Sequence, residues 1–294
     1  MLRLLASSIF YATLWVGGRA VAQEKPVVVS SFTVIQDWVQ TIGGKGVETI
    51  NIIPPRSEAH GFQLSPRQAK DLRRARLIVA MSPDFEPWLA AWGKANGRLD
   101  TIIWLNEHTG TGKGQALHQN PHAWTDPTMV KRMTTALAEK ITQITGKNDA
   151  QVSVIQYLKE IESVDAELRE RFDRLGTEKR LLISHHANLE GFAQRYGLTV
   201  AGTILAGGSA ESADPSARHF SELLSVIRLR KIHVVVSDEG QNEAFARRLT
   251  EDAGLPPPLS LSFEYLEPPG QPGDTWASMM RLNGQRLFKA LDAR

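Results

Sequence analysis

The sequence predicts an α/β protein of two lobes with parallel-sheet cores, bridged by a long rigid helix. Short β-branched runs alternate with longer helical patterns along the chain, and a long helical stretch divides these runs into two groups of four. Apolar runs of four to eight residues separated by helices are typical of parallel sheets covered on both faces. The length of 294 residues also favours two domains, since single cores stop growing at roughly 250 to 300 residues.

Residues 1–22 have the features of a secretory signal peptide. Arg3 supplies the positive start, an apolar run extends from Leu4 to Val16, and Ala20-Val21-Ala22 fits a small-residue cleavage site. The apolar run is short for a membrane-spanning helix, which needs roughly 20 residues. We therefore expect a protein exported to the periplasm.

Composition excludes several classes of site and partner. The absence of Cys removes disulfides, thiolate metal sites, cysteine nucleophiles and the acylated cysteine of a bacterial lipoprotein. Removing Arg3 and Arg19 with the signal segment leaves 32 of the 34 basic residues, which equals the 32 acidic ones. A neutral mature chain gives no electrostatic reason to bind nucleic acid.

The predicted N-terminal lobe covers residues 23–148 and the C-terminal lobe residues 177–294. The first lobe is expected to contain strands at Pro26–Ser31, Val47–Ile53, Arg76–Met81 and Thr101–Leu105, and the second at Arg180–Ser184, Thr199–Leu205, Ile232–Ser237 and Leu259–Leu266. A helical pattern from Val130 to Ile144 closes the first lobe, and Gly146-Lys147-Asn148 interrupts it.

The linking helix is predicted at residues 149–176. Apolar residues from Ile155 to Leu175 recur on one face, and Gly176 ends the pattern. A helix of about 25 residues is about 38 Å long, longer than most helices within a domain. We interpret it as a rigid strut between the lobes, although periodicity equally allows an ordinary packed helix of one domain.

Histidines at three separate places are candidate functional residues. His60 follows a strand and precedes a helix that Ser65-Pro66 would cap, so it lies where open α/β sheets bind ligands. His122 lies in the stiff segment Asn120-Pro121-His122-Ala123-Trp124-Thr125-Asp126-Pro127, which would hold an imidazole in one direction. The alternatives are a solvated loop residue at His60 and a capping segment around His122.

The third place is the pair His185-His186, directly after a strand. Adjacent side chains leaving a strand diverge, so one of the two is expected to face a cleft, unless both are surface residues. Acidic residues follow the later strands at Asp238-Glu239, Glu264 and Glu267. These carboxylates could be metal ligands, general bases or helix caps.

His60, His122 and His186 are 62 and 64 residues apart, so they form no local motif of the H-E-x-x-H kind. Three imidazoles and a carboxylate suit Zn²⁺, which is bound tetrahedrally by nitrogen and oxygen. Four protein ligands would close the coordination shell and leave no position for a catalytic water. The set therefore favours capture of a metal over catalysis.

Several segments resemble the periplasmic metal-binding proteins of zinc and manganese ABC importers, the cluster A-I solute-binding proteins. The similar segments are Ala59–Pro66, Leu77–Val79 with Phe85–Leu89, Asn120–Pro127, Ser184–His186 with Tyr196–Leu198, and Thr275–Asn283. The most specific of these resembles the family's D/N-P-H-x-W pattern. The resemblance covers essentially the whole mature chain and implies two α/β lobes with a metal ion between them.

The resemblance implies His60, His122, His186 and a carboxylate as metal ligands. Gapless counting back from Tyr196 selects His186, whereas a one-residue insertion would select His185. Counting back from Thr275 places Glu264 where the family has its ligand Asp, with Glu267 as the alternative. His108 and His118 flank a short loop where many zinc-binding members carry a long His-rich one.

We therefore expect a monomeric, non-catalytic protein that captures Zn²⁺ as cargo and delivers it to a membrane-embedded ABC permease. Mn²⁺ is the less expected cargo, because it prefers more oxygen ligands. Binding requires neutral imidazoles, so metal affinity should fall as the pH drops through about 6.5. The alternatives are a zinc hydrolase with an open coordination position and a degenerate member that acts as an adhesin or sensor.

Overall fold

The computed structural model describes residues 24–57, 59, 61–110, 120–205 and 215–293. The predicted signal peptide and His118 lie outside these ranges. In the first half of the chain the elements are β1 (Val27–Ser30), α1 (Thr33–Gly43), β2 (Glu48–Asn51), α2 (Pro66–Arg74), β3 (Leu77–Ala80), α3 (Pro87–Asn96), β4 (Ile102–Trp104) and α4 (Pro127–Thr145). The remainder contains α5 (Asp149–Asp173), β5 (Leu181–Ser184), α6 (Glu190–Arg195), β6 (Thr199–Thr203), α7 (Ala217–Arg230), β7 (Val236–Asp238), α8 (Ala244–Ala253), β8 (Leu259–Leu261) and α9 (Trp276–Asp292).

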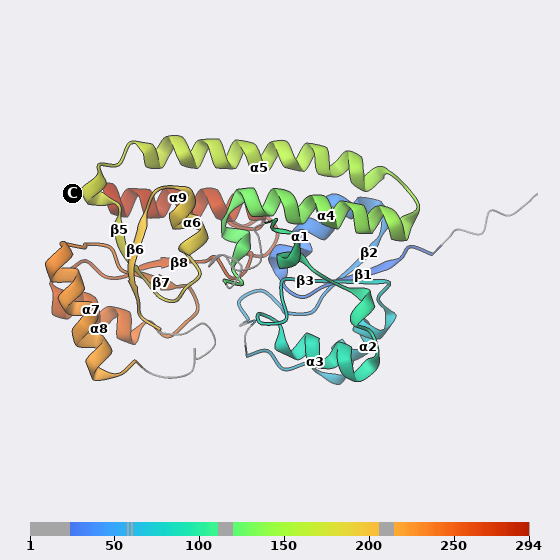
Figure 1. Ribbon diagram of the computed structural model, residues 1–294, viewed down its shortest axis with the longest axis horizontal. Coiled ribbons are helices and arrows are strands. Elements are labelled where there is room, and N and C mark those ends of the chain that lie inside the picture. The colour runs from blue at the N-terminus through green and yellow to red at the C-terminus, as the bar shows by residue number, and fades with distance from the viewer. Residues whose placement is uncertain (1–23, 58, 60, 111–119, 206–214, 294) are drawn as a thin grey trace, which may run out of the picture.

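The two halves repeat one strand arrangement. The first sheet is fully parallel with the order β2-β1-β3-β4. In the second half β5 pairs with β6 and β7 with β8, and a parallel bridge between Ile183 and Val235 joins the two pairs. The resulting spatial order β6-β5-β7-β8 matches that of the first sheet. This arrangement confirms the predicted α/β fold of two lobes (Figure 1).

All eight strands are shorter in the structure than predicted, and two of them differ most from their predicted bounds. The strand expected at residues 232–237 is β7, which begins only at Val236, because Val235 contributes a single bridge to β5. The strand expected at residues 259–266 ends at Leu261. Beyond it the chain leaves the sheet, since the Phe263 carbonyl and the Leu266 amide form hydrogen bonds with the first half of the protein.

Helix α5 extends across both halves of the molecule, with α9 beside it (Figure 1). It packs against α1 and α4 of the first half and against α9 of the second. The helix therefore bridges the halves, as the strut interpretation predicts, and is also packed along its length, as an ordinary domain helix would be. It ends three residues before the predicted Gly176, because the Arg180 guanidinium donates to the carbonyls of Phe172 and Leu175.

One large buried cluster runs through both halves. It includes Val29 and Val79 of the first sheet, Trp38 of α1, and Phe172 of α5 with Phe192 of α6. A smaller cluster fills the space between β5, β6 and the helices α7 and α8. Among the described residues, no helix combines the length and the apolar character that crossing a membrane requires. The shared core fixes the position of the strand ends that face each other across the middle of the molecule.

Candidate metal centre

His122 is held rigidly in the segment that precedes α4. Its side chain is 1% exposed, its Nδ1 lies 2.8 Å from Asn120 Oδ1, and the same oxygen accepts its backbone N–H at 2.9 Å. The Asn120 Nδ2 donates to the Ala187 carbonyl at 2.6 Å, which sets the orientation of the amide. An amide oxygen only accepts, so Nδ1 of His122 carries the proton and Nε2 presents its lone pair.

The capping alternative for this segment is also correct, because Asp126 caps α4 by accepting the Thr128 N–H at 2.8 Å. A segment that caps the helix thus also fixes the imidazole of His122. The ring is packed edge-to-face against Phe85 and Trp124. The Trp124 indole N–H donates to the Phe263 carbonyl at 2.7 Å and ties this wall to the second half.

His186 lies just beyond the carboxyl end of β5, opposite His122. Its Nδ1 is 2.5 Å from Asp238 Oδ2, and its Nε2 is 3.3 Å from Nε2 of His122. Burial alone lowers the pKa of His186, but the charges and hydrogen bonds of Asp238 and Glu264 raise it well above its ordinary value of 6.5. In the metal-free protein the proton on Nε2 of His186 therefore faces the lone pair of His122, where a cation could replace it.

Glu264 completes the cluster. Its Oε1 lies 3.6 Å from Nε2 of His122 and 3.5 Å from Nε2 of His186. One ligand atom from each of the three residues lies within 4.8 Å of the other two. The side chain of Glu264 is 20% exposed, whereas the two imidazoles are nearly buried. The carboxylate therefore lies on the side of the cluster that solvent reaches.

Two contacts place the Glu264 backbone. On one side the Phe263 carbonyl accepts the Trp124 indole N–H, and on the other the Leu266 amide donates to the Thr33 hydroxyl at 2.8 Å. Both partners belong to the first half of the chain. A segment of the second half is thereby fastened to the first half at the point where its carboxylate meets His122.

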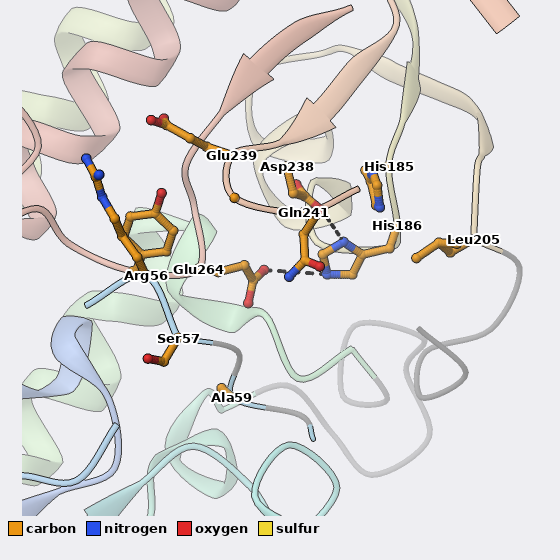
Figure 2. A pocket seen from close by; sticks show the side chains of 12 residues that line it. Arg56, Ser57, Ala59, His185, His186, Leu205, Asp238, Glu239, Gln241 and Glu264 are labelled. Carbon is orange, nitrogen blue, oxygen red and sulfur yellow. Dashed lines mark hydrogen bonds and ion pairs between the residues drawn. The ribbon is translucent and has the colours of Figure 1, made fainter. Parts of the chain in front are cut away.

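A cavity of about 40 Å³ opens beside this cluster. Ser57 and Ala59 line it from the first half, and His186, Asp238 and Glu264 from the second (Figure 2). This volume is enough for an ion or a few waters. His60 lies outside the described residues, although its neighbour Ala59 lines the cavity.

The sequence left two pairs of alternative ligands, His185 or His186 and Glu264 or Glu267, and the members of each pair lie at different distances from His122. His185 also lines the cavity, but the ligand atoms that converge come from His122, His186 and Glu264, and within the described residues the buried Nδ1 of His185 has no hydrogen-bond partner. Burial lowers the pKa of His185. Glu267 is bound to Arg56 at 2.9 Å, away from the histidines. His186 and Glu264 are the members of each pair that lie beside His122.

The comparison with protein families identifies the chain's relatives. The model of the ZnuA family, zinc-uptake complex component A, periplasmic, matches residues 28–290. The chain belongs to this family. Its members are metal-binding substrate-binding proteins of ABC importers, so the resemblance seen in the sequence is confirmed.

The ZnuA-family chain is similar to proteins whose names refer to different metals. It is 26% identical over 274 residues to the iron-binding protein YfeA of Yersinia pestis, covering 89% of this chain and 85% of the relative. It is 19% identical over 283 residues to the manganese ABC transporter substrate-binding lipoprotein PsaA of Streptococcus pneumoniae, covering 92% and 90%. The family thus fixes the class of cargo, a metal ion, and leaves the element open.

Solved structures support the fold of this ZnuA-family chain. The periplasmic zinc-binding protein TroA of Treponema pallidum superposes with a TM-score of 0.82 at 22% identity, covering 91% of this chain and 99% of that one. A manganese-bound periplasmic metal-binding protein of Candidatus Liberibacter asiaticus gives 0.78 at 19% identity, covering 91% and 100%. At these identities the likeness establishes the fold alone.

Two residues beside the cluster of His122, His186 and Glu264 were not predicted from the sequence to be functional. Asn120 orients His122, and its place two residues before the histidine was the signal that could have revealed it. Asn188, fully buried, donates to both Asp238 and Glu264 at 3.0 and 3.1 Å. Nothing in the local sequence marks Asn188, because its two partners come from segments far along the chain.

Proposed function

We propose that the chain captures Zn²⁺ between its lobes through His60, His122, His186 and Glu264 and delivers it to a membrane-embedded ABC permease. The observation that supports this most is the convergence of two imidazole Nε2 atoms and a carboxylate oxygen, drawn from three separate segments, within 4.8 Å of one another. Residues 1–22 would direct export to the periplasm, where the mature chain acts as a monomer. The metal would lie between a lobe at 23–148 and a lobe at 177–294, bridged by residues 149–176.

The separations within the cluster favour a tetrahedral ion. Ligands 2.0 to 2.1 Å from a tetrahedral Zn²⁺ are about 3.3 Å apart. The Nε2 atoms of His122 and His186 are 3.3 Å apart, and Glu264 Oε1 lies 3.6 and 3.5 Å from them. The three atoms are therefore spaced close to one face of such a tetrahedron.

The donor atoms favour zinc over manganese. Imidazole nitrogen suits Zn²⁺, whereas Mn²⁺ prefers carboxylate, carbonyl and water oxygen. Two of the three ligand atoms brought together are imidazole nitrogens, and His60 would add a third. Relatives named for iron and manganese make those ions the alternatives to be tested.

We propose that the protein is not an enzyme, because a fourth ligand from His60 would close the shell to a catalytic water. A zinc hydrolase requires an open position that activates water. Turnover of a model ester by the zinc-loaded protein, abolished by His122→Ala, would support the hydrolase alternative instead.

The decisive experiment measures the metal content of the purified mature protein by mass spectrometry, followed by competition titration against a chromophoric chelator. We expect one tightly held zinc per chain. His122→Ala should weaken zinc binding on the order of 10-fold or more, since changes that only disturb ligand orientation cost that much. The exposed His108 provides the matched control, and His108→Ala should leave the affinity unchanged. A protein that neither holds zinc nor competes for it would refute the proposal.

A further inference from the structure

Asp238, the last residue of β7, is enclosed beside the proposed metal centre. Its side chain is 5% exposed, and both carboxylate oxygens are engaged: Oδ2 with Nδ1 of His186 at 2.5 Å and Oδ1 with Nδ2 of Asn188 at 3.0 Å. Strands β5 and β7 are parallel neighbours, so their carboxyl ends bring His186 and Asp238 to the same edge. Figure 2 shows Asp238 above the His186 ring and Glu264 to the left of it, each joined to the ring by a dashed line.

The contact with Asp238 fixes which nitrogen of His186 is available. A carboxylate only accepts hydrogen bonds, so Nδ1 of His186 must carry a proton. The nitrogen that can bind a metal is then Nε2, which faces His122 and Glu264. Without Asp238, the ring could rotate or present the other nitrogen.

Asn188 connects Asp238 to Glu264. Its fully buried Nδ2 group has two hydrogens, and it donates to Asp238 Oδ1 at 3.0 Å and to Glu264 Oε1 at 3.1 Å. A single amide nitrogen therefore bridges the two carboxylates, with Asp238 beside Nδ1 and Glu264 beside Nε2 of the His186 ring.

The two imidazoles of the centre are supported differently. His122 is backed by the neutral amide oxygen of Asn120, whereas His186 is backed by a carboxylate. A carboxylate behind a ligand imidazole makes it a stronger donor and fixes its orientation. Among the described residues lining the cavity, the one guanidinium or ammonium is that of Arg56, which binds Glu267 instead.

We propose that Asp238 is a positioning residue of the metal site, which aims Nε2 of His186 at the ion and supplies, with Glu264, the second negative charge that balances a dication. The inference rests on the proposed capture of a divalent metal. It assigns charge balance to a residue outside the coordination shell, so the shell itself stays rich in nitrogen. Such a shell favours zinc over manganese, because manganese gains less from a stronger imidazole donor.

The test compares the full mature chain with Asp238→Asn and Asp238→Ala by chelator competition for Zn²⁺ and for Mn²⁺. Asp238→Asn keeps an oxygen that can accept from Nδ1 of His186 but removes the charge, and Asp238→Ala removes both. We expect zinc affinity to fall about 10- to 100-fold in Asp238→Asn and further in Asp238→Ala. The ratio of zinc to manganese affinity should fall with it. Asp252→Asn, which removes a carboxylate paired with Arg248 on the surface, is the control.

A second measurement separates positioning from folding. Nitrogen NMR of ¹⁵N-histidine-labelled, zinc-loaded protein should place the His186 proton on Nδ1 in the parent and in Asp238→Asn, and lose that assignment in Asp238→Ala. Thermal unfolding of the metal-free variants reports any purely structural damage. If Asp238→Ala does not fold, the Asp238→Asn affinities decide the question.

If the parent and Asp238→Asn bind zinc equally well, the role of Asp238 is overturned and the proposed function stands. An NMR spectrum with Nδ1 of His186 on the metal would also overturn it. Parent protein that binds no divalent metal would instead refute the proposed function, and the role of Asp238 with it.

Discussion

Lowering the pH should weaken metal binding, beginning above pH 6.5 rather than at it. The ordinary pKa of histidine alone would place this fall near pH 6.5. In the folded, metal-free protein burial lowers the pKa of His186, but the carboxylates of Asp238 and Glu264 outweigh this effect and raise it well above 6.5. A metal at Nε2 must displace the proton that this raised pKa keeps on His186. Metal affinity should therefore already fall as the pH is lowered through the neutral range.

The magnitude follows from the displacement of a single proton. Below the raised pKa of His186, each pH unit should weaken the apparent affinity about tenfold, or about 1.4 kcal/mol. Calorimetry at pH 7 in buffers of different ionisation enthalpy should detect about one proton released per zinc bound. Competition titrations between pH 6 and 8 give the slope directly. An affinity that is flat across this range, or binding with no proton release, would refute the reasoning.

The same proton has the opposite effect on the metal-free fold. Since the folded pKa of His186 exceeds its unfolded value, its contribution to stability is fully present below about pH 6.5 and is lost as the pH rises through the raised value. Acidification toward 6.5 should therefore raise the melting temperature of the metal-free protein while it weakens zinc binding. This opposition distinguishes loss of the ligand from loss of the fold.

Substitutions at Glu264, Phe172 and Glu86 test the site and the core. Glu264→Gln should weaken zinc binding about 10-fold or more in the chelator titration. Glu267→Gln, which breaks only the ion pair with the exposed Arg56, should change it less than about fivefold. Phe172→Ala, which empties a buried position on α5, should lower the free energy of unfolding by about 3 to 5 kcal/mol in urea titration. The control Val152→Ala, at an exposed position of the same helix, should stay within about 0.5 kcal/mol of the parent. Equal effects of the two substitutions would contradict the packing of α5. Burial raises the pKa of Glu86 to about 7, so stability should increase as the pH falls from 7 toward 4.5 and lose that dependence in Glu86→Gln. Glu86→Ala removes the acceptor for two buried amides and should cost about 1 to 3 kcal/mol.

The strands and helices could largely be predicted from the sequence, because the signals that specify them are local. All eight strands overlap their predicted ranges, and Ser65-Pro66 caps and begins α2 as expected. The failures occur where a distant contact replaces a local one. Arg180 binds the Phe172 carbonyl in the last turn of α5 and the Leu175 carbonyl just beyond it, where the helix ends early. Hydrogen bonds to the first half draw residues 263–266 out of the last strand.

The candidate site likewise combines features set by the local sequence with features set by distant contacts. The sequence alone supplied the residue types, three histidines and a set of carboxylates, because each lies at a strand end or in a stiff segment that local pattern reveals. Counting along the chain selected His186 but could not settle it against His185, because the ring of His186 is held by Asp238, 52 residues away. It could not choose between Glu264 and Glu267 either, because Trp124 and Thr33 hold that loop from 139 and 233 residues away. Local periodicity determines which elements form, whereas the direction of a side chain at their ends depends on contacts that exist only once the two halves have packed together.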